Sequence, residues 1–118
     1  MTMTTETIAQ EAKRLLEPIP EEQWTDEHGY SDGVSKCCAL GHWNRLHSSN
    51  PNNYNTINCA NGNADNQMAD IGDAFFNDPL FGYYKIAEVN DGVDDRYPQS
   101  TPKQRIMALL DDMIAAGF

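Results

Sequence analysis

The sequence predicts an all-α fold, in which residues 1–118 form one compact domain of four to five helices with a long asparagine-rich loop. The length of 118 residues is typical of a single hydrophobic core. Apolar residues recur in several segments at the three- and four-residue spacing of a helix face. The one segment with strand propensity has no second strand with which it could pair. These three observations together favour a helical domain over a sheet.

The first predicted helix covers residues 5–16, where one face is apolar. That face consists of Ile8, Ala12, Leu15 and Leu16. We expect Thr4 or Thr5 to cap the start of the helix with its hydroxyl oxygen. Pro18 and Pro20 should end it, because proline lacks the backbone N–H and disfavours helix in the residue before it.

The last predicted helix, over residues 102–116, has the clearest end signals. Thr101 is a favourable N-cap, Pro102 suits the first helical position, and Gln104 completes a Thr-x-x-Gln capping box. Gly117 can close the helix because glycine readily adopts a left-handed conformation. The buried stripe should consist of Ile106, Leu109, Leu110, Met113 and Ile114.

Two interior helices are predicted over residues 34–47 and 64–77. The first should be buried on a broad side, with Gly41 at a close approach of another backbone. The second should end at the Asp78-Pro79 pair and expose Asp65, Asp70 and Asp73. Its apolar face should consist of Ala64, Met68, Ile71 and Phe75.

The segment 80–89 suits either a strand or a short helix. Its aromatic and β-branched residues have strand propensity, but Tyr83, Ile86 and Val89 also recur at helical spacing. We predict a short helix, followed by a turn at Asp91-Gly92. The long loop should lie at residues 48–66, which include eight asparagines.

The chain is strongly acidic. Eighteen acidic and eight basic residues give a net charge of −10 and a pI near 4.4. This argues against direct nucleic-acid binding and against docking on anionic membranes, since both need a basic face. No apolar run approaches the roughly 20 residues of a membrane span. The N-terminus shows no secretory signal, so we expect a cytoplasmic protein with three free thiols, Cys37, Cys38 and Cys59.

Several short segments, taken in order, resemble a family of small proteins. They are Cys38-Ala39-Leu40-Gly41, Ile86-Ala87-Glu88-Val89-Asn90-Asp91, Thr101-Pro102 and Arg105-Ile106-Met107-Ala108-Leu109-Leu110-Asp111, with Trp24 upstream. This order resembles a functionally uncharacterised family from bacteria and their phages. The chain departs from it at Val89, where the family has Trp, and at His42, where it has Ala. The resemblance implies a compact helical domain, permits a phage origin, and implies no activity.

A metal site is one candidate for chemistry. Cys38 and His42 stand four residues apart, which can present two ligands from one helical face, and Cys59 or His47 could add a third. The spacing matches no zinc pattern, and the segment from Asn90 lacks the glutamate that an EF-hand calcium loop has at its twelfth position. The alternative is that Cys38 is a core residue and His42 lies at the helix edge. We expect no metal or other cofactor; Cys38, His42 and Cys59 would be the first ligands to test.

A thiol nucleophile is a second candidate. Cys37 or Cys38 near a helix N-terminus could have a lowered pKa. The possible bases are His28, His42 and His47, and the possible orienting groups are Asn90 and Asp91. No cysteine-protease pattern surrounds either cysteine, so the sequence favours a protein that is not an enzyme.

The acid-rich segment from residue 21 to residue 32 carries the leading functional prediction. Its proposed partner-binding residues are Glu21, Glu22, Trp24, Asp26, Glu27 and Tyr30. Carboxylates with aromatic anchors suit a basic protein partner, so we predict a non-enzymatic binding protein. With a phage origin, it would inhibit a host nucleic-acid-handling or defence protein. The alternatives are a pocket for a nucleotide-like or other polar metabolite, a zinc- or thiol-dependent enzyme, and a charge that serves solubility alone.

Overall fold

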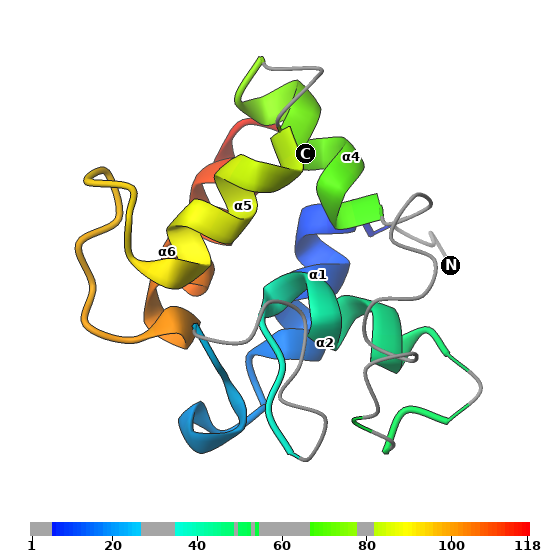
Figure 1. Cartoon of the computed structure of the whole chain (residues 1–118). Coiled ribbons are helices and arrows are strands. Elements are labelled where there is room, and N and C mark those ends of the chain that lie inside the picture. Colours follow the sequence, from blue (N-terminus) through cyan, green and yellow to red (C-terminus); the bar gives the residue numbers. More distant parts are fainter. Residues whose placement is uncertain (1–5, 27–34, 49, 53, 55–66, 78–81) are drawn as a thin grey trace.

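The computed structural model describes residues 6–26, 35–48, 50–52, 54, 67–77 and 82–118. Within these residues the chain is all-α, as the sequence predicts, and Figure 1 shows the arrangement of its helices. The elements are α1 (Ile8–Leu16), a short 3-10 helix η1 (Glu21–Gln23), α2 (Ala39–Leu46), α4 (Gln67–Phe75), α5 (Gly82–Asp91) and α6 (Pro102–Ala115). None of the described helices is long and apolar enough to cross a membrane.

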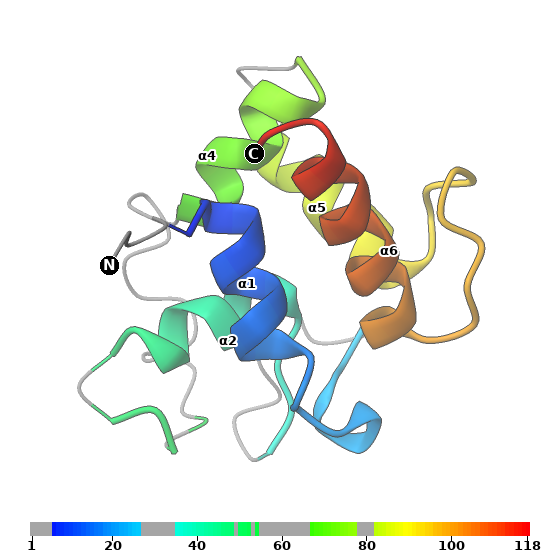
Figure 2. The ribbon, with the colours of Figure 1, turned by 180° about the vertical axis from the view of Figure 1, so that it is seen from behind.

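The helices pack around one shared core. α1 lies beside α6 and also contacts α2 and α4, while α5 packs against both α4 and α6. Seen from behind, α1 and α6 lie in front of α2 and α5 (Figure 2). The largest fully buried apolar side chains are Leu16, Leu40, Met68, Ile86, Val89, Ile106, Leu109, Leu110 and Met113. The stripe predicted on the last helix is therefore confirmed, with Ile114 half-buried at its margin.

Thr101, Pro102 and Gly117 act at the ends of α6 as predicted, but Gln104 does not complete the predicted capping box. The Thr101 hydroxyl oxygen accepts the backbone N–H of Gln104 at 3.1 Å, and Pro102 occupies the first helical position. The side-chain oxygen of Gln104 accepts instead from the Ser100 hydroxyl, at 3.3 Å. Gly117 closes the helix with a φ of +91°.

The cap of α1 corrects the prediction. Thr7, rather than Thr4 or Thr5, caps the helix, and Thr4 and Thr5 lie outside the described residues. The Thr7 hydroxyl oxygen accepts the N–H of Gln10 at 3.2 Å, and the Gln10 side chain accepts the N–H of Thr7 at 2.9 Å. This reciprocal pair is a complete capping box, which explains why the helix begins at Ile8.

The predicted helix over residues 34–47 begins five residues later, at Ala39. The reason is a pairing between distant segments, which holds Cys37 in extended conformation. The Cys37 N–H donates to the carbonyl oxygen of Gln23, and the Cys37 carbonyl oxygen accepts the N–H of Thr25, each at 3.1 Å. The helix that remains is buried on a broad side, as predicted, and Gly41 lies inside it.

The segment that suited either helix or strand is helical. α5 buries Ile86 and Val89 at the expected spacing, and the following turn brings the N–H of Gly92 to 3.2 Å from the Val89 carbonyl oxygen. In α4 Met68 is buried and Ile71 and Phe75 are half-buried. Asp70 is exposed as predicted, and Asp73 is half-buried. Ala64, Asp65, the Asp78-Pro79 pair and most of the asparagine-rich segment fall outside the described residues.

Candidate functional site

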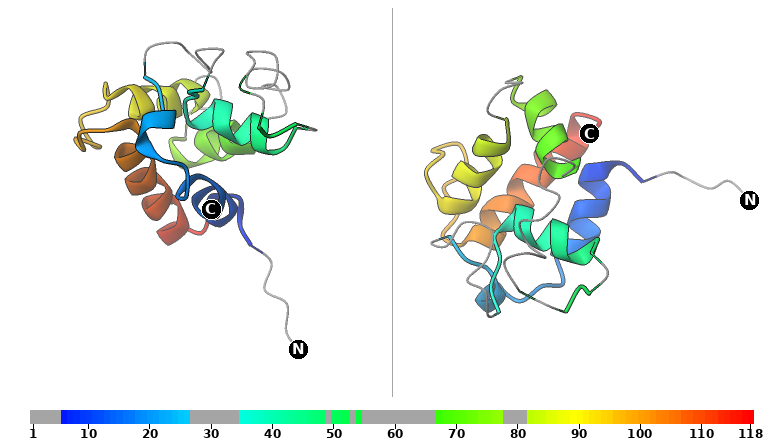
Figure 3. Two further views of the ribbon diagram at one scale, coloured as in Figure 1. Left: turned by 90° about the horizontal axis from the view of Figure 1, so that it is seen from below. Right: turned by 45° about the vertical axis from the view of Figure 1, so that its right-hand side comes forward.

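Residues 21–26 place carboxylates outside the protein and an aromatic residue inside it. Glu21, Glu22 and Asp26 are exposed, whereas Trp24 is 4% exposed and Thr25 is 6% exposed. η1 lies at the lower end of the molecule in Figure 1, and it faces the viewer when the molecule is seen from below (Figure 3, left). Two other residues predicted to bind a partner, Glu27 and Tyr30, lie outside the described residues.

Trp24 belongs to the core, which corrects its predicted role as an anchor for a partner. Its indole N–H donates to the carbonyl oxygen of Ile19 at 3.3 Å, and its ring centroid lies 5.0 Å from that of His42. Burial of so large an apolar surface stabilises the segment that carries the carboxylates. Trp24 therefore positions the neighbouring acids and presents almost no surface of its own.

Asn90 joins this segment to the helices. Its side chain is 1% exposed, and its amide nitrogen donates to the carbonyl oxygen of Thr25 at 2.9 Å and to a carboxylate oxygen of Asp91 at 3.0 Å. Its amide oxygen accepts the N–H of Ala39, the first residue of α2, at 3.1 Å. One buried side chain thus ties together residues 24–26, the start of α2 and the end of α5.

Arg105 extends from α6 to the end of α5. Its guanidinium donates to three backbone carbonyl oxygens, those of Val89 at 3.0 Å, Asn90 at 2.8 Å and Gln99 at 3.0 Å. A carboxylate oxygen of Asp26 lies 3.7 Å from it. Because the last carbonyl groups of a helix lack intrahelical partners, this buried cation supplies the bonds that end α5.

Asp91 lies beside this network, and its environment disfavours the charged form. Burial and the neighbouring Asp26 carboxylate raise the pKa of Asp91, against the opposing effects of the Asn90 hydrogen bond and the Arg105 charge.

Glu21 lies near the start of α6, where its carboxylate accepts the Thr101 hydroxyl at 3.2 Å. We call the surface formed by Glu21, Glu22, Asp26 and Asp91 the acidic edge.

His42 is a buried structural residue, which corrects its predicted place at a helix edge. It is fully buried, its Nε2–H donates to the Gln23 carbonyl oxygen at 2.8 Å, and its Nδ1 accepts from Nε of Arg45 at 2.9 Å. Burial and the Arg45 charge lower the pKa of His42 to about 3. Both ring nitrogens are therefore already engaged, and neither is available to a metal ion.

The proposed metal ligands Cys38 and His42 stand one helical turn apart, but His42 has no free ring nitrogen. Cys38 is the N-cap of α2, and its carbonyl oxygen accepts the N–H of His42 at 2.9 Å, while the His42 ring bonds the Gln23 carbonyl oxygen and Arg45. Cys59 lies outside the described residues. In the part of the chain that the structure describes, no three His, Cys, Asp or Glu side chains are grouped to hold a metal ion.

The proposed thiol nucleophiles are both inside the protein. Cys37 is fully buried and Cys38 is 6% exposed, and neither forms a disulfide. The histidines proposed as bases have other contacts: His47 lies between the Trp43 carbonyl oxygen, at 2.8 Å, and the Glu11 carboxylate, at 3.1 Å. His28 lies outside the described residues.

Comparison with known proteins finds no matching family model, no matching curated protein and no matching solved structure. The resemblance to a family of bacterial and phage proteins therefore stays a prediction.

Proposed function

We propose that the protein is a non-enzymatic binding protein that associates with a basic protein surface through the acidic edge. The observation that carries the proposal is the alternation in residues 21–26, where Glu21, Glu22 and Asp26 are exposed around the buried Trp24 and Thr25. Such a segment presents carboxylates from a backbone that is already ordered. Less conformational entropy is then lost when a partner binds.

Long-range contacts support this ordering. The backbone pairing with Cys37 holds one side of the segment, and Asn90 holds the carbonyl oxygen of Thr25 on the other. Asp26 lies 3.7 Å from the buried Arg105. Asp91 joins the same surface because Asn90 donates to its carboxylate.

The charge distribution supports a basic partner. Two of the eight basic residues, Arg45 and Arg105, lie inside the protein with 5% and 6% of their surface exposed. At the surface, Lys13, Arg14 and Arg96 each pair with a carboxylate. Opposite charge across an interface speeds encounter and selects among partners.

The class of partner follows from this charge. Proteins that hold nucleic acid present basic surfaces to phosphates, and an acidic protein can occupy such a surface in place of nucleic acid. We therefore propose a nucleic-acid-handling or defence protein of a host as the partner, with inhibition by occupation of its basic surface.

Two charge reversals of equal size test the proposal. Glu21→Lys/Glu22→Lys alters the acidic edge, whereas Asp70→Lys/Asp73→Lys alters α4, at the other end of the molecule in Figures 1 and 2. Each wild-type or variant protein is immobilised and exposed to a cell lysate. A basic protein retained by the wild type and by the α4 variant, but lost from the edge variant, supports the proposal.

Two outcomes contradict it. If both variants lose the captured basic protein equally, net charge alone is responsible for binding. If both variants retain it equally, the acidic edge is not the interface. The circular dichroism spectrum of each variant should match the wild type, since all four side chains are exposed or half-buried and form no ion pair with a described residue.

A further inference from the structure

Arg45 is a buried cation whose partners among the described residues are all uncharged. It projects from α2 with 5% of its surface exposed. Its Nε donates to Nδ1 of His42 at 2.9 Å, and its Nη1 donates to the carbonyl oxygen of Pro51 at 2.6 Å. The guanidinium carbon lies 4.3 Å from the centre of the Tyr54 ring, so the aromatic face covers the plane of the guanidinium.

The two buried arginines differ in their counter-charge. Arg105 has a carboxylate oxygen of Asp26 at 3.7 Å, but among the described residues no carboxylate lies within ion-pair distance of Arg45. Arginine keeps its proton in proteins, so burial cannot be relieved by loss of the charge. A buried charge without a counter-ion is strongly unfavourable. The described residues leave this charge uncompensated.

The groups around Arg45 fix its orientation. Because the Nδ1 of His42 accepts from Arg45, the proton of the neutral imidazole is on Nε2, which donates to the Gln23 carbonyl oxygen at 2.8 Å. The side chain of Gln23 also accepts the Tyr54 hydroxyl at 3.0 Å. Gln23 thus holds both the ring beside the guanidinium and the ring stacked over it.

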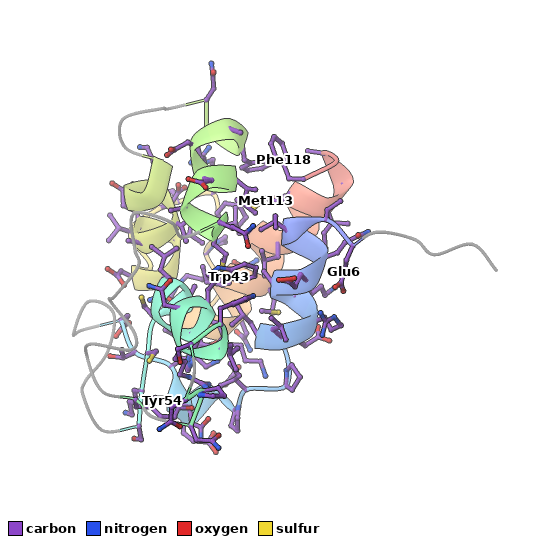
Figure 4. The ribbon with its side chains drawn as sticks, turned by 90° about the vertical axis from the view of Figure 1, so that its right-hand side faces the viewer. Glu6, Trp43, Tyr54, Met113 and Phe118 are labelled. Carbon is purple, nitrogen blue, oxygen red and sulfur yellow. The ribbon has the colours of Figure 1, made fainter. Side chains whose placement is uncertain are left out.

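This arrangement leaves one terminal nitrogen, Nη2, with no hydrogen bond to any described residue. Arginine presents its N–H groups in a planar fork that matches the oxygens of phosphate and carboxylate groups. Tyr54 and Pro51, which border the guanidinium, are both half-buried. In Figure 4 Tyr54 lies below α2, at the end of the molecule away from Phe118.

We infer that Arg45 is the recognition group of a binding site for a small oxyanion, a phosphate-type or carboxylate-type group that bonds Nη2 and supplies the missing negative charge. His42 acts as a positioning residue, because it accepts from Nε and so directs the terminal nitrogens. Tyr54 covers the guanidinium face and excludes water from it. The net charge of −10 disfavours general accumulation of anions, so binding should be local and saturable.

Thermal melts at pH 7 test the inference. Sodium phosphate and sodium acetate are titrated separately, and sodium chloride keeps the ionic strength constant. The expected result is a saturable rise in Tm with at least one of the two anions, since a ligand that binds only the folded state stabilises it. A response to phosphate alone assigns a phosphate-type ligand, and a response to acetate alone assigns a carboxylate-type ligand.

Three variants show whether Arg45 is responsible. Arg45→Met removes the buried charge and should lower the apparent affinity for the anion, obtained from the rise in Tm, by about ten-fold or more. Arg45→Lys keeps a charge but lacks the fork, and should weaken it by a smaller factor. Arg14→Met is the matched control: it removes one charge from a side chain that is 58% exposed, and should leave the response unchanged.

The inference is overturned if neither anion gives a saturable rise in Tm in the wild type, or if Arg45→Met responds like the wild type. If Arg45→Met melts at too low a temperature to be titrated, the comparison between Arg45→Lys and Arg14→Met decides. An equal response from those two variants likewise overturns the inference.

Discussion

The amide oxygen of Asn90 accepts a hydrogen bond from the backbone N–H of Ala39 at 3.1 Å, so a side chain at the end of α5 caps the start of α2. The same side chain donates to the Thr25 carbonyl oxygen, which precedes the exposed Asp26. The helical core and the acidic edge are therefore held by one buried amide.

Asn90→Ala should destabilise the protein by at least about 2 kcal/mol. The substitution leaves the Ala39 N–H and the Thr25 carbonyl oxygen without their partner, and each buried unpaired group costs about 1–3 kcal/mol. Urea denaturation gives the free energy of unfolding. A loss below about 0.5 kcal/mol, as at ordinary surface positions, would show that Asn90 does not connect these segments.

Arg105→Met should lower the free energy of unfolding by about 3–5 kcal/mol. It leaves three carbonyl oxygens and the Asp26 carboxylate without their common partner. Arg14→Met is the comparison. Arg14 pairs with Glu6, and their side chains are 58% and 37% exposed, so its loss should lower the free energy of unfolding far less than the loss of Arg105. Equal losses in the two variants would contradict the structural role given to Arg105.

Gly92→Ala and Gly117→Ala form a matched pair. Both glycines have positive φ, +78° and +91°, where an alanine costs about 1–2 kcal/mol. At Gly92 the added Cβ would also lie 3.1 Å from the guanidinium carbon of Arg105, whereas at Gly117 it would meet no atom within 4 Å. The free energy of unfolding should fall further in Gly92→Ala. Equal losses in the two variants would mean that Arg105 moves aside freely and would contradict the close packing at Gly92.

The free energy of unfolding should decrease as the pH falls, because unfolding lets the buried His42 take up a proton. The pKa of His42 is about 3 when folded and about 6.5 when unfolded, so unfolding takes up a proton between these values. The contribution of neutral His42 is complete above about pH 6.5 and is lost as the pH falls toward 3, by at most about 1.4 kcal/mol per pH unit. His42→Gln should show a shallower loss of unfolding free energy between pH 6.5 and pH 5. Identical slopes would contradict a buried neutral histidine.

The elements that were predicted correctly are those set by neighbouring residues. Thr101 and Pro102 stand directly at the start of α6, and the spacing of Ile86 and Val89 indicates the helix α5. The start of α2 is different, because it is set by Asn90, 51 positions away, and by the pairing of Cys37 with residues 23–25. No local pattern contains those contacts.

The candidate site was predictable in part. The exposure of Glu21, Glu22 and Asp26 follows from their charge, but the burial of Trp24 depends on long-range packing. The roles of the two buried arginines, Arg45 and Arg105, were not predicted from the sequence. Arg105 stands four residues before Leu109 on the buried stripe of α6, and a cation at such a position indicates an internal partner.

The dissociation constant of the complex with a captured basic protein tests the central claim most directly. The account predicts that Glu21→Lys/Glu22→Lys raises this constant by about ten-fold or more at low salt, and that the difference shrinks as salt screens the charges. Asp70→Lys/Asp73→Lys should have a much smaller effect. Equal dissociation constants for the two folded variants would contradict the claim that the acidic edge binds the partner.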